Sequence, residues 1–186
     1  MPEGSKDATI LIATSYQALN RAFDSKNEDM LFTNCTVLIL FAGFFIEATL
    51  NYIFEFLNID IEAFPRDEKS GEGVLHPGMQ AKLAFFYNEF IKESKSSNWK
   101  KLRKKSVYKK ISMIFPGFSD LHEFRNDISH GRINESAKSL ETALKLRNQA
   151  KDIVDRLYTI TTDKGYSVKR LETYSDAIAS LAKNDE

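Results

Sequence analysis

The chain has 186 residues, of which 42% are apolar, 12% aromatic and 28% charged. This composition is typical of a globular domain with a real core, and it excludes a chain that is disordered over most of its length. The 26 Lys and Arg residues balance the 26 Asp and Glu residues. Net charge alone therefore predicts no polyanionic partner, and any such prediction depends on how the charges are distributed.

We expect residues 1–186 to form one domain, with residues 1–6 disordered. Cys35 is the single cysteine, so no disulfide can form within the chain. A lone thiol favours a reducing compartment, and the first residues, MPEGSK, lack the basic and then apolar pattern of a signal peptide. The sequence thus predicts a cytoplasmic protein in which Cys35, beside an apolar run, is buried and unreactive.

Helical periodicity dominates the chain, and no segment shows the sustained alternation of a strand. We therefore expect an all-α, single-domain helical bundle, with an up-and-down core and additional short helices. A loop rich in charge, Pro and Gly is predicted over residues 59–77. The predicted helices cover residues 7–24, 28–58, 79–93, 102–114, 120–130, 135–161 and 167–182.

The helix predicted over residues 28–58 is apolar nearly all round, which is typical of the central helix of a bundle. Its longest apolar run, residues 37–46, has ten residues, whereas a bilayer span needs about 18. A longer window admits Glu47 and Glu55, and carboxylates at membrane depth are costly. We expect a buried helix of a soluble protein and no membrane partner.

Turn-forming residues mark the ends of the later helices. Ser119 is a candidate N-cap for the helix over residues 120–130, and Gly131 suits the position directly after it. Gly165, in a predicted turn with the two residues before it, ends the helix over residues 135–161. The apolar stripe expected on the helix over residues 135–161 consists of Leu140, Leu144, Ile153, Val154 and Leu157.

The common sequence signatures of metal and nucleotide sites are missing. The three histidines, His76, His122 and His130, form no HExxH pattern, and no Cys/His cluster has the spacing of a zinc site. The phosphate loops GxxxxGK[ST] and GxGxxG and the GxSxG nucleophile elbow are absent as well. We therefore expect no metal and no cofactor, and we interpret His76 as a loop residue.

The segment from Leu121 to Gly131 combines an apolar face with a polar rim. On a helix, Leu121, Phe124 and Ile128 fall within an arc of about 60° and form the buried face. Arg125 lies at one border of that face, and His130 lies roughly 140° from it. Asn126 is one turn before His130, so its side chain is expected to position the imidazole and fix its tautomer. His122 is a weaker candidate for the same cleft.

The string RNDISH, from Arg125 to His130, resembles the R-N-x-x-x-H signature of HEPN domains (higher eukaryotes and prokaryotes nucleotide-binding). The segment FFIEATLN, from Phe44 to Asn51, is similar to the long central helix of that family, an apolar run interrupted by an acidic residue. The motif follows this helix at a distance and precedes another long helix, as it does in the family. The resemblance covers roughly residues 34–157.

This resemblance implies a helical bundle that forms a homodimer and places two copies of the motif across one cleft. It implies a metal-independent endoribonuclease, a toxin or phage-defence effector, with RNA as its substrate and an antitoxin or other protein as a further partner. It also implies that Glu47 supports Arg125. Other members of the family have lost activity, so the alternative is a non-catalytic helical module that binds a partner protein or a nucleotide.

The residue types suit cleavage of RNA without a metal. A neutral imidazole can take the proton of a ribose 2′-hydroxyl, and an imidazolium can protonate the leaving 5′-oxygen, so His130 can serve either role near neutral pH. Arg125 offers a planar fork of donors to the phosphoryl oxygens. A purely structural interpretation is that Arg125 pairs with a carboxylate and that His130 satisfies carbonyl groups at a helix end.

A thin polar line runs along the predicted central helix, since Gly43, Glu47, Asn51 and Glu55 recur every four residues. One interpretation is a strip of helix that faces water. The other is that Glu47 or Asn51 lies near Arg125 and holds its guanidinium by a charge-assisted hydrogen bond.

The positive charge is concentrated in residues 92–110, which hold nine cations and one acid, a net charge of +8. The rest of the chain then carries −8, and such polarisation is typical of a groove for a polyanion. A solvated face, or a basic amphipathic helix that binds a membrane surface or a partner, are the alternatives. The predicted RNA-binding residues are Lys100, Lys101, Arg103, Lys104, Lys105 and Trp99, the last as a stacking platform.

Overall fold

The computed structural model describes residues 10–17, 31–65, 77–132 and 139–170. These residues form helices, and no strand occurs among them, which confirms the predicted all-α helical bundle. Residues 10–17 are helical. The other elements are α2 (Leu31–Phe56), α3 (Met79–Phe86), the π-helical turn η2 (Tyr87–Ile91), α4 (Trp99–Leu102), α5 (Lys105–Ile114), α6 (Phe118–Ser129) and α7 (Leu140–Asp163).

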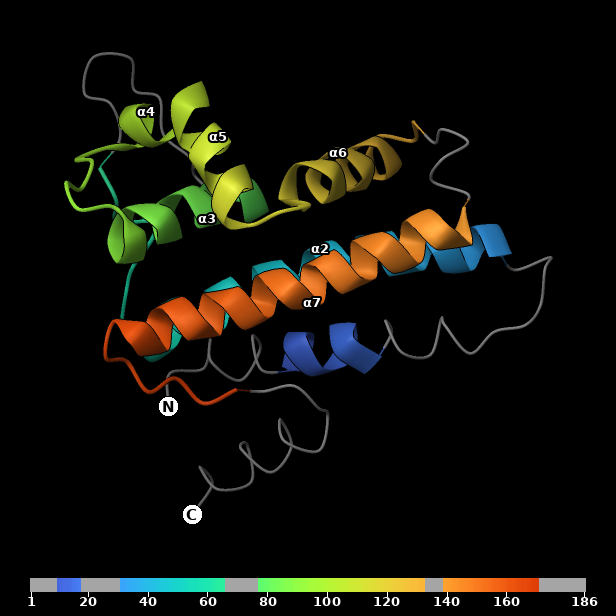
Figure 1. Cartoon of the computed structure of the whole chain (residues 1–186), viewed down its shortest axis with the longest axis horizontal. Helices are drawn as coiled ribbons and strands as arrows, with labels where there is room; N and C mark the ends of the chain where they lie inside the picture. The colour runs from blue at the N-terminus through green and yellow to red at the C-terminus, as the bar shows by residue number, and fades with distance from the viewer. Residues whose placement is uncertain (1–9, 18–30, 66–76, 133–138, 171–186) are drawn as a thin grey trace.

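Helices α2 and α7 lie side by side along the long axis and run in the same direction (Figure 1). Helix α6 runs in the opposite direction over them, and residues 10–17 pack on the other side, where the ring of Tyr16 lies 5.8 Å from that of Phe45. Elements α3, α4 and α5 gather over the C-terminal half of α2. The motif helix α6 therefore lies directly on the central helix, which places its residues beside those of α2.

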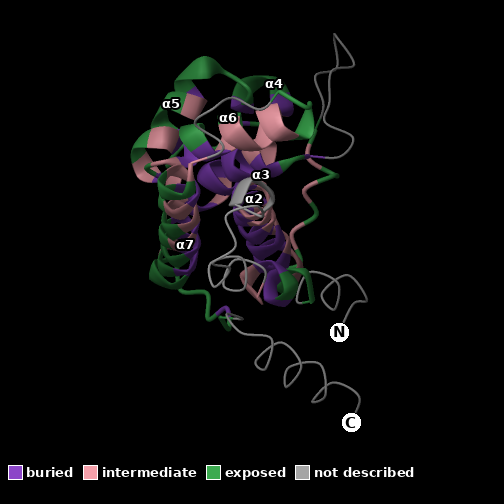
Figure 2. Ribbon diagram, turned by 90° about the vertical axis from the view of Figure 1, so that its right-hand side faces the viewer, coloured by how far each residue is buried: buried purple, intermediate pink, exposed green. Residues whose placement is uncertain are grey.

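The core is built around α2, as expected for the central helix. Its side chains with no exposed area include Leu38, Ile39, Ile46, Leu50 and Ile53. Figure 2 shows the buried residues gathered where α2, α3 and α7 face one another, and exposed residues on the outside of α4 and α5. Cys35 is also fully buried, and this burial raises the pKa of its thiol.

One stretch of the described chain, Asn34–Phe56 within α2, is long and apolar enough to cross a membrane. This stretch has 23 residues and is therefore longer than the uninterrupted ten-residue apolar run, residues 37–46, from which we expected no membrane span. In the fold, 67% of its most apolar 18-residue window is buried against other elements. Burial of this kind is also found in the core helix of a bundle.

Three helices end in the same way, with a left-handed residue directly after the last turn. Asn58 (φ 53°), Gly131 (φ 69°) and Gly165 (φ 87°) hold these positions after α2, α6 and α7. After α6, the amide of Gly131 donates to the carbonyl of Ile128, and the amide of Arg132 donates to that of Asp127. This pair of bonds is the Schellman motif. The expected roles of Gly131 and Gly165 are confirmed.

Two predicted helices have different boundaries in the structure. The helix expected over residues 102–114 begins at Lys105, as α5, because the chain turns at Arg103 and Lys104, and Leu102 belongs to the separate short helix α4. The helix expected over residues 79–93 begins at Met79, but its regular part ends at Phe86 and the π-helical turn η2 follows.

The start of α6 was also predicted wrongly. The helix begins at Phe118 with Gly117 as its N-cap, and the hydroxyl of Ser119 instead lies 2.6 Å from that of Ser112 on α5. Helix α7 begins after Ser139, whose hydroxyl accepts from the amide of Thr142.

The apolar stripe of α7 was only partly predicted. Ile153, Val154 and Leu157 are buried as expected, whereas Leu140 is exposed and Leu144 is only half-buried. Ala143, Leu146 and Ala150 take their places in the core, because they continue the three- and four-residue spacing of Ile153, Val154 and Leu157 toward the start of the helix.

Several predictions lie wholly or partly outside the described residues. They concern the N-terminal residues 1–6, the ends of the first predicted helix, the start of the second, and part of the long loop. The described part of that loop, residues 59–65 and 77, contains no helix. The last predicted helix begins at residue 167, but residues 167–170 are not helical and the remainder is not described.

Substitution of Gly117 by Ala should destabilise the fold more than the same change at Gly165. Both positions have a positive φ, which costs an L-residue about 1–2 kcal/mol. A Cβ on Gly117 would also lie 2.2 Å from Cδ of Gln149, whereas a Cβ on Gly165 would meet nothing within 4 Å. We expect Gly117→Ala to lower the free energy of unfolding in urea by about 2–4 kcal/mol and Gly165→Ala by about 1–2. Equal losses would show that Gln149 does not restrict this turn.

Candidate functional site

The carboxylate of Glu47 joins three helices. On α2 its Oε2 accepts from Nη2 of Arg125 on α6 at 3.1 Å, and its Oε1 accepts from Nζ of Lys82 on α3 at 2.9 Å. The three side chains are 19%, 19% and 12% exposed, in that order. The predicted contact between Glu47 and Arg125 therefore forms, across 78 residues of sequence. Because the pairs are largely shielded from water, their attraction is stronger than that of a surface ion pair.

The guanidinium of Arg125 is held by more than this charge. Its Cζ lies 5.3 Å from the centre of the Phe44 ring, a cation–π contact. Its aliphatic stem passes over Gly43, where an added Cβ would lie 2.5 Å from Cδ of Arg125. Its Nε is buried and has no hydrogen-bond partner among the described residues. Gly43 thus lets Arg125 lie flat on α2, and the arginine keeps a fixed direction.

Of the polar line predicted on α2, Gly43 is buried, whereas Glu47, Asn51 and Glu55 are half-buried and line a pocket of about 450 Å³. Four carboxylates and one ammonium group therefore face it, from Glu47, Glu55, Asp60, Glu62 and Lys82. Such a lining repels an anion, so a phosphate would reach Arg125 from outside this pocket.

The side chain of Asn126 bonds His122 and not His130, contrary to the prediction. Its amide nitrogen lies 3.1 Å from Nε2 of His122, one turn earlier on α6. Because an amide nitrogen only donates, Nε2 accepts and the ring proton belongs on Nδ1. The His122 ring also stacks on Phe118, with ring centres 5.7 Å apart. Burial lowers the pKa of His122 below its ordinary value, and the charge of Arg125 lowers it further.

His130 lies at the exposed C-terminal end of α6, where its backbone amide donates to the carbonyls of Asn126 and Asp127. It is the C-cap residue, directly before Gly131. The side chain of Arg125 points inward to α2, whereas the imidazole of His130 is on the surface. Within one chain, the structure thus brings Arg125 to Glu47 and leaves His130 free to meet a ligand or another molecule.

The predicted RNA-binding cations are exposed, but Trp99 is not. Lys100, Lys101, Arg103, Lys104 and Lys105 lie on the surface of α4, α5 and the turn between them. Trp99 is 1% exposed, so its prediction as a stacking platform is wrong. Its ring packs instead in a buried cluster with Phe64 and Phe85, at 5.3 and 6.1 Å between ring centres.

Lys82, the second cation on Glu47, was not predicted from the sequence. A signal was present, because Lys82 is the single charged residue in the helix MQAKLAFF. A lone charge on an otherwise apolar helix needs a partner when that helix is packed on a core. No group of three or more His, Cys, Asp or Glu side chains is placed to hold a metal ion within the described ranges.

Comparison with known proteins finds no match, whether with family models, curated proteins or solved structures.

Substitutions at the ion-pair network should follow a fixed order. Glu47→Gln leaves two shielded cations without a counter-charge, whereas Arg125→Gln leaves Glu47 still paired with Lys82. We expect losses in the free energy of unfolding of about 2–4 kcal/mol for Glu47→Gln and about 1–2 for Arg125→Gln. A double-mutant cycle should give a coupling of about 1–2 kcal/mol.

A control for this series is Lys95→Gln. Lys95 pairs with Glu89, but its side chain is 57% exposed, so its removal should cost less than about 1 kcal/mol. A larger loss for Arg125→Gln than for Glu47→Gln, or a coupling near zero, would contradict the bridging role of Glu47.

The His122 ring should titrate below its ordinary pKa of 6.5. Because the unfolded chain then binds this proton more readily than the folded one, the protein loses stability as pH falls below about 6.5. NMR titration of the ring should give the lowered pKa, and Arg125→Gln should raise it part of the way back. His122→Gln should remove this part of the pH dependence of unfolding. A pKa at or above 6.5, or one that Arg125→Gln does not change, would contradict the environment described here.

Proposed function

We propose that this chain is a metal-independent endoribonuclease of HEPN type, a cytoplasmic homodimer that acts as a toxin or phage-defence effector. The observation that carries the proposal is the ion pair between Glu47 and Arg125. The resemblance implies this contact between Glu47 on the central helix and Arg125 on the motif helix. If the match of residues 125–130 to the motif were due to chance, there would be no reason to expect Glu47 to contact Arg125.

The proposed reaction needs only the ribose and two imidazoles. The 2′-oxygen attacks phosphorus as its proton passes to one neutral imidazole, and the bond from phosphorus to the 5′-oxygen breaks as an imidazolium protonates that oxygen. His130 supplies these groups, and Arg125 stabilises the charge that develops on the phosphoryl oxygens. The products are a 2′,3′-cyclic phosphate and a 5′-hydroxyl. Glu47 acts as a positioning residue, because it touches Arg125 and not the substrate.

The proposed dimer supplies the second imidazole that the reaction needs. One chain offers one imidazole at the end of α6, and a second copy supplies the other. Apolar side chains beside the ion pair, among them Phe41, Phe44 and Phe124, are only half-buried, so a second copy packed here would shield them from water. The surface cations from Lys100 to Lys105 would add affinity for the RNA backbone, with a steep dependence on salt.

The alternative is a non-catalytic helical module that binds a partner protein or a nucleotide. Two observations favour it. The guanidinium of Arg125 is already occupied by Glu47, and Asn126 bonds His122 instead of positioning His130. In this case the same residues would stabilise the fold and the α6 surface would serve only for binding.

The decisive assay is cleavage of single-stranded RNA in EDTA, with products identified by mass spectrometry. We expect the full chain to yield 2′,3′-cyclic phosphate ends, and His130→Ala to reduce the rate by about 10²–10⁴-fold, the usual contribution of a general acid or base. Ser129→Ala, an exposed neighbour at the same helix end, is the matched control and should retain the rate.

Full activity in His130→Ala, or no cleavage by the wild-type chain, would support the binding module instead. Growth distinguishes a toxin from a scaffold, because overexpression of a toxin should arrest cells and His130→Ala should relieve the arrest. Light scattering should report a dimer for the wild-type chain and for His130→Ala.

A further inference from the structure

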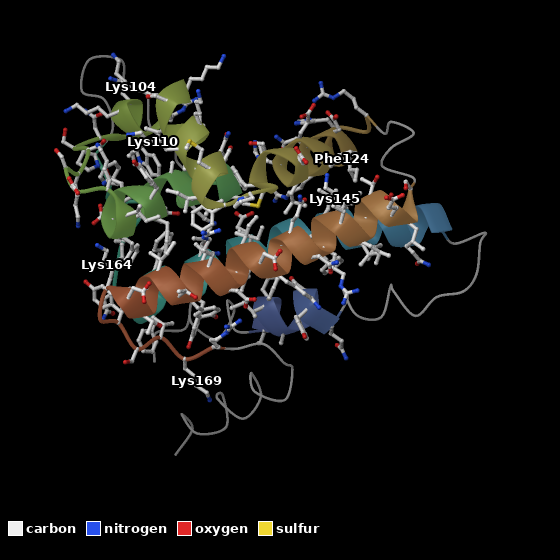
Figure 3. All side chains as sticks on the ribbon, in the orientation of Figure 1. Lys104, Lys110, Phe124, Lys145, Lys164 and Lys169 are labelled. Carbon is white, nitrogen blue, oxygen red and sulfur yellow. The ribbon has the colours of Figure 1, made fainter. Side chains whose placement is uncertain are left out.

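A second feature of the molecule is a pocket of about 260 Å³ at the opposite end from the exposed end of α6. Figure 3 labels Lys104 and Lys110 at this α4–α5 end, and Phe124 away from it on α6. Four lysines and two serines line the pocket: Lys92, Lys101, Lys104, Lys110, Ser96 and Ser106. They come from separate elements, namely the segment after η2, α4, the turn after α4, and α5.

The wall formed by the segment after η2 is fixed by a buried asparagine. Asn88 is fully buried, its Oδ1 accepts from the amide of Ser96 at 2.6 Å, and its Nδ2 donates to the carbonyl of Ser96 at 3.4 Å. The ammonium group of Lys92 donates to the hydroxyl of Ser96 at 2.8 Å. The π-helical turn η2 carries Asn88, and such turns are often found at functional sites. This wall is thus held in place by paired polar groups.

The charge of the pocket is uncompensated within the described part of the chain. No carboxylate lines it, and the nearby Glu89 is already paired with Lys95 at 2.6 Å. Lys101 donates to the hydroxyl of Ser97, a neutral partner. Four ammonium groups around one small pocket repel one another, so a bound anion would relieve this repulsion. Helix α5 adds to the effect, since it begins at the pocket and has no acidic residue in its first turn.

The size and lining of the pocket restrict the class of anion. Its volume is below the roughly 300–1,000 Å³ of sites for drug-sized ligands, so it favours a compact group. Ammonium groups and hydroxyls are donors to several oxygens at once, which suits linked phosphates better than a single carboxylate. The buried Tyr87 and Val107 close the pocket behind the polar groups.

We propose that this pocket binds the linked phosphoryl groups of a di- or triphosphate, either a free polyphosphate or the phosphorylated 5′ end of an RNA strand. The proposal does not depend on ribonuclease activity, since it concerns residues remote in sequence and position from Arg125 and His130. The proposal assigns a specific ligand to the basic residues 92–110, whereas their charge alone predicts only a general attraction to polyanions.

Calorimetric titration of the full chain with inorganic triphosphate tests the proposal. Two double variants remove the same charge from the same region. Lys104→Gln with Lys110→Gln changes the pocket, and Lys105→Gln with Lys109→Gln changes exposed neighbours outside it. We expect one site per chain, weakened about tenfold or more by the first pair and less than about threefold by the second. All four lysines are exposed, and circular dichroism checks that both variants fold.

Oligonucleotides distinguish the two sources of phosphate. If RNA with a 5′-triphosphate binds more tightly than the same RNA with a 5′-hydroxyl, and the pocket variant loses this preference, the ligand is the RNA end. If triphosphate binds and the two RNAs do not differ, the ligand is a free polyphosphate. Absence of triphosphate binding, or equal weakening by the two double variants, would overturn the proposal. Neither result would bear on cleavage by Arg125 and His130, which the product assay tests separately.

Discussion

The carboxylate of Glu47 is the contact on which the rest of the site depends. It carries one negative charge for two cations, Arg125 and Lys82, and so connects α6 and α3 to the central helix. A largely shielded carboxylate is stable only when its neighbours supply donors and positive charge, and both cations meet that requirement. The same contact fixes the direction of the motif arginine. Because the same carboxylate holds three helices together and directs Arg125, removal of Glu47 should change both the stability of the bundle and the geometry of the site.

Much of the fold could be predicted, because it depends on local periodicity. The apolar character of residues 37–46 identified the central helix, and Gly131 and Gly165 marked helix ends where a left-handed residue is required. The error at Trp99 originates in contacts remote along the sequence. Trp99 sits among cations in sequence, but rings from α3 and the preceding loop bury it. Asn126 had two histidines one turn away, and the stacking of His122 on Phe118 makes the earlier one its partner.

The two pockets divide the surface by charge. Carboxylates dominate the pocket beside Glu47, and lysines line the pocket beside α5. A chain with no net charge thus presents an anion-repelling and an anion-attracting region at different places. This arrangement would exclude RNA from one side of Arg125 and orient a strand toward the other. It explains how a neutral protein could still bind a polyanion in one defined direction.

We propose that Arg125 and His130 jointly contact one phosphodiester. The most direct test is an NMR titration of the full chain with a short RNA whose 2′-hydroxyls are methylated, which binds and cannot be cleaved. This joint contact predicts that the guanidinium signals of Arg125 and the ring signals of His130 shift together, with one common dissociation constant. A titration in which RNA shifts only the lysines of residues 92–110, and leaves both of these residues unchanged, would contradict it.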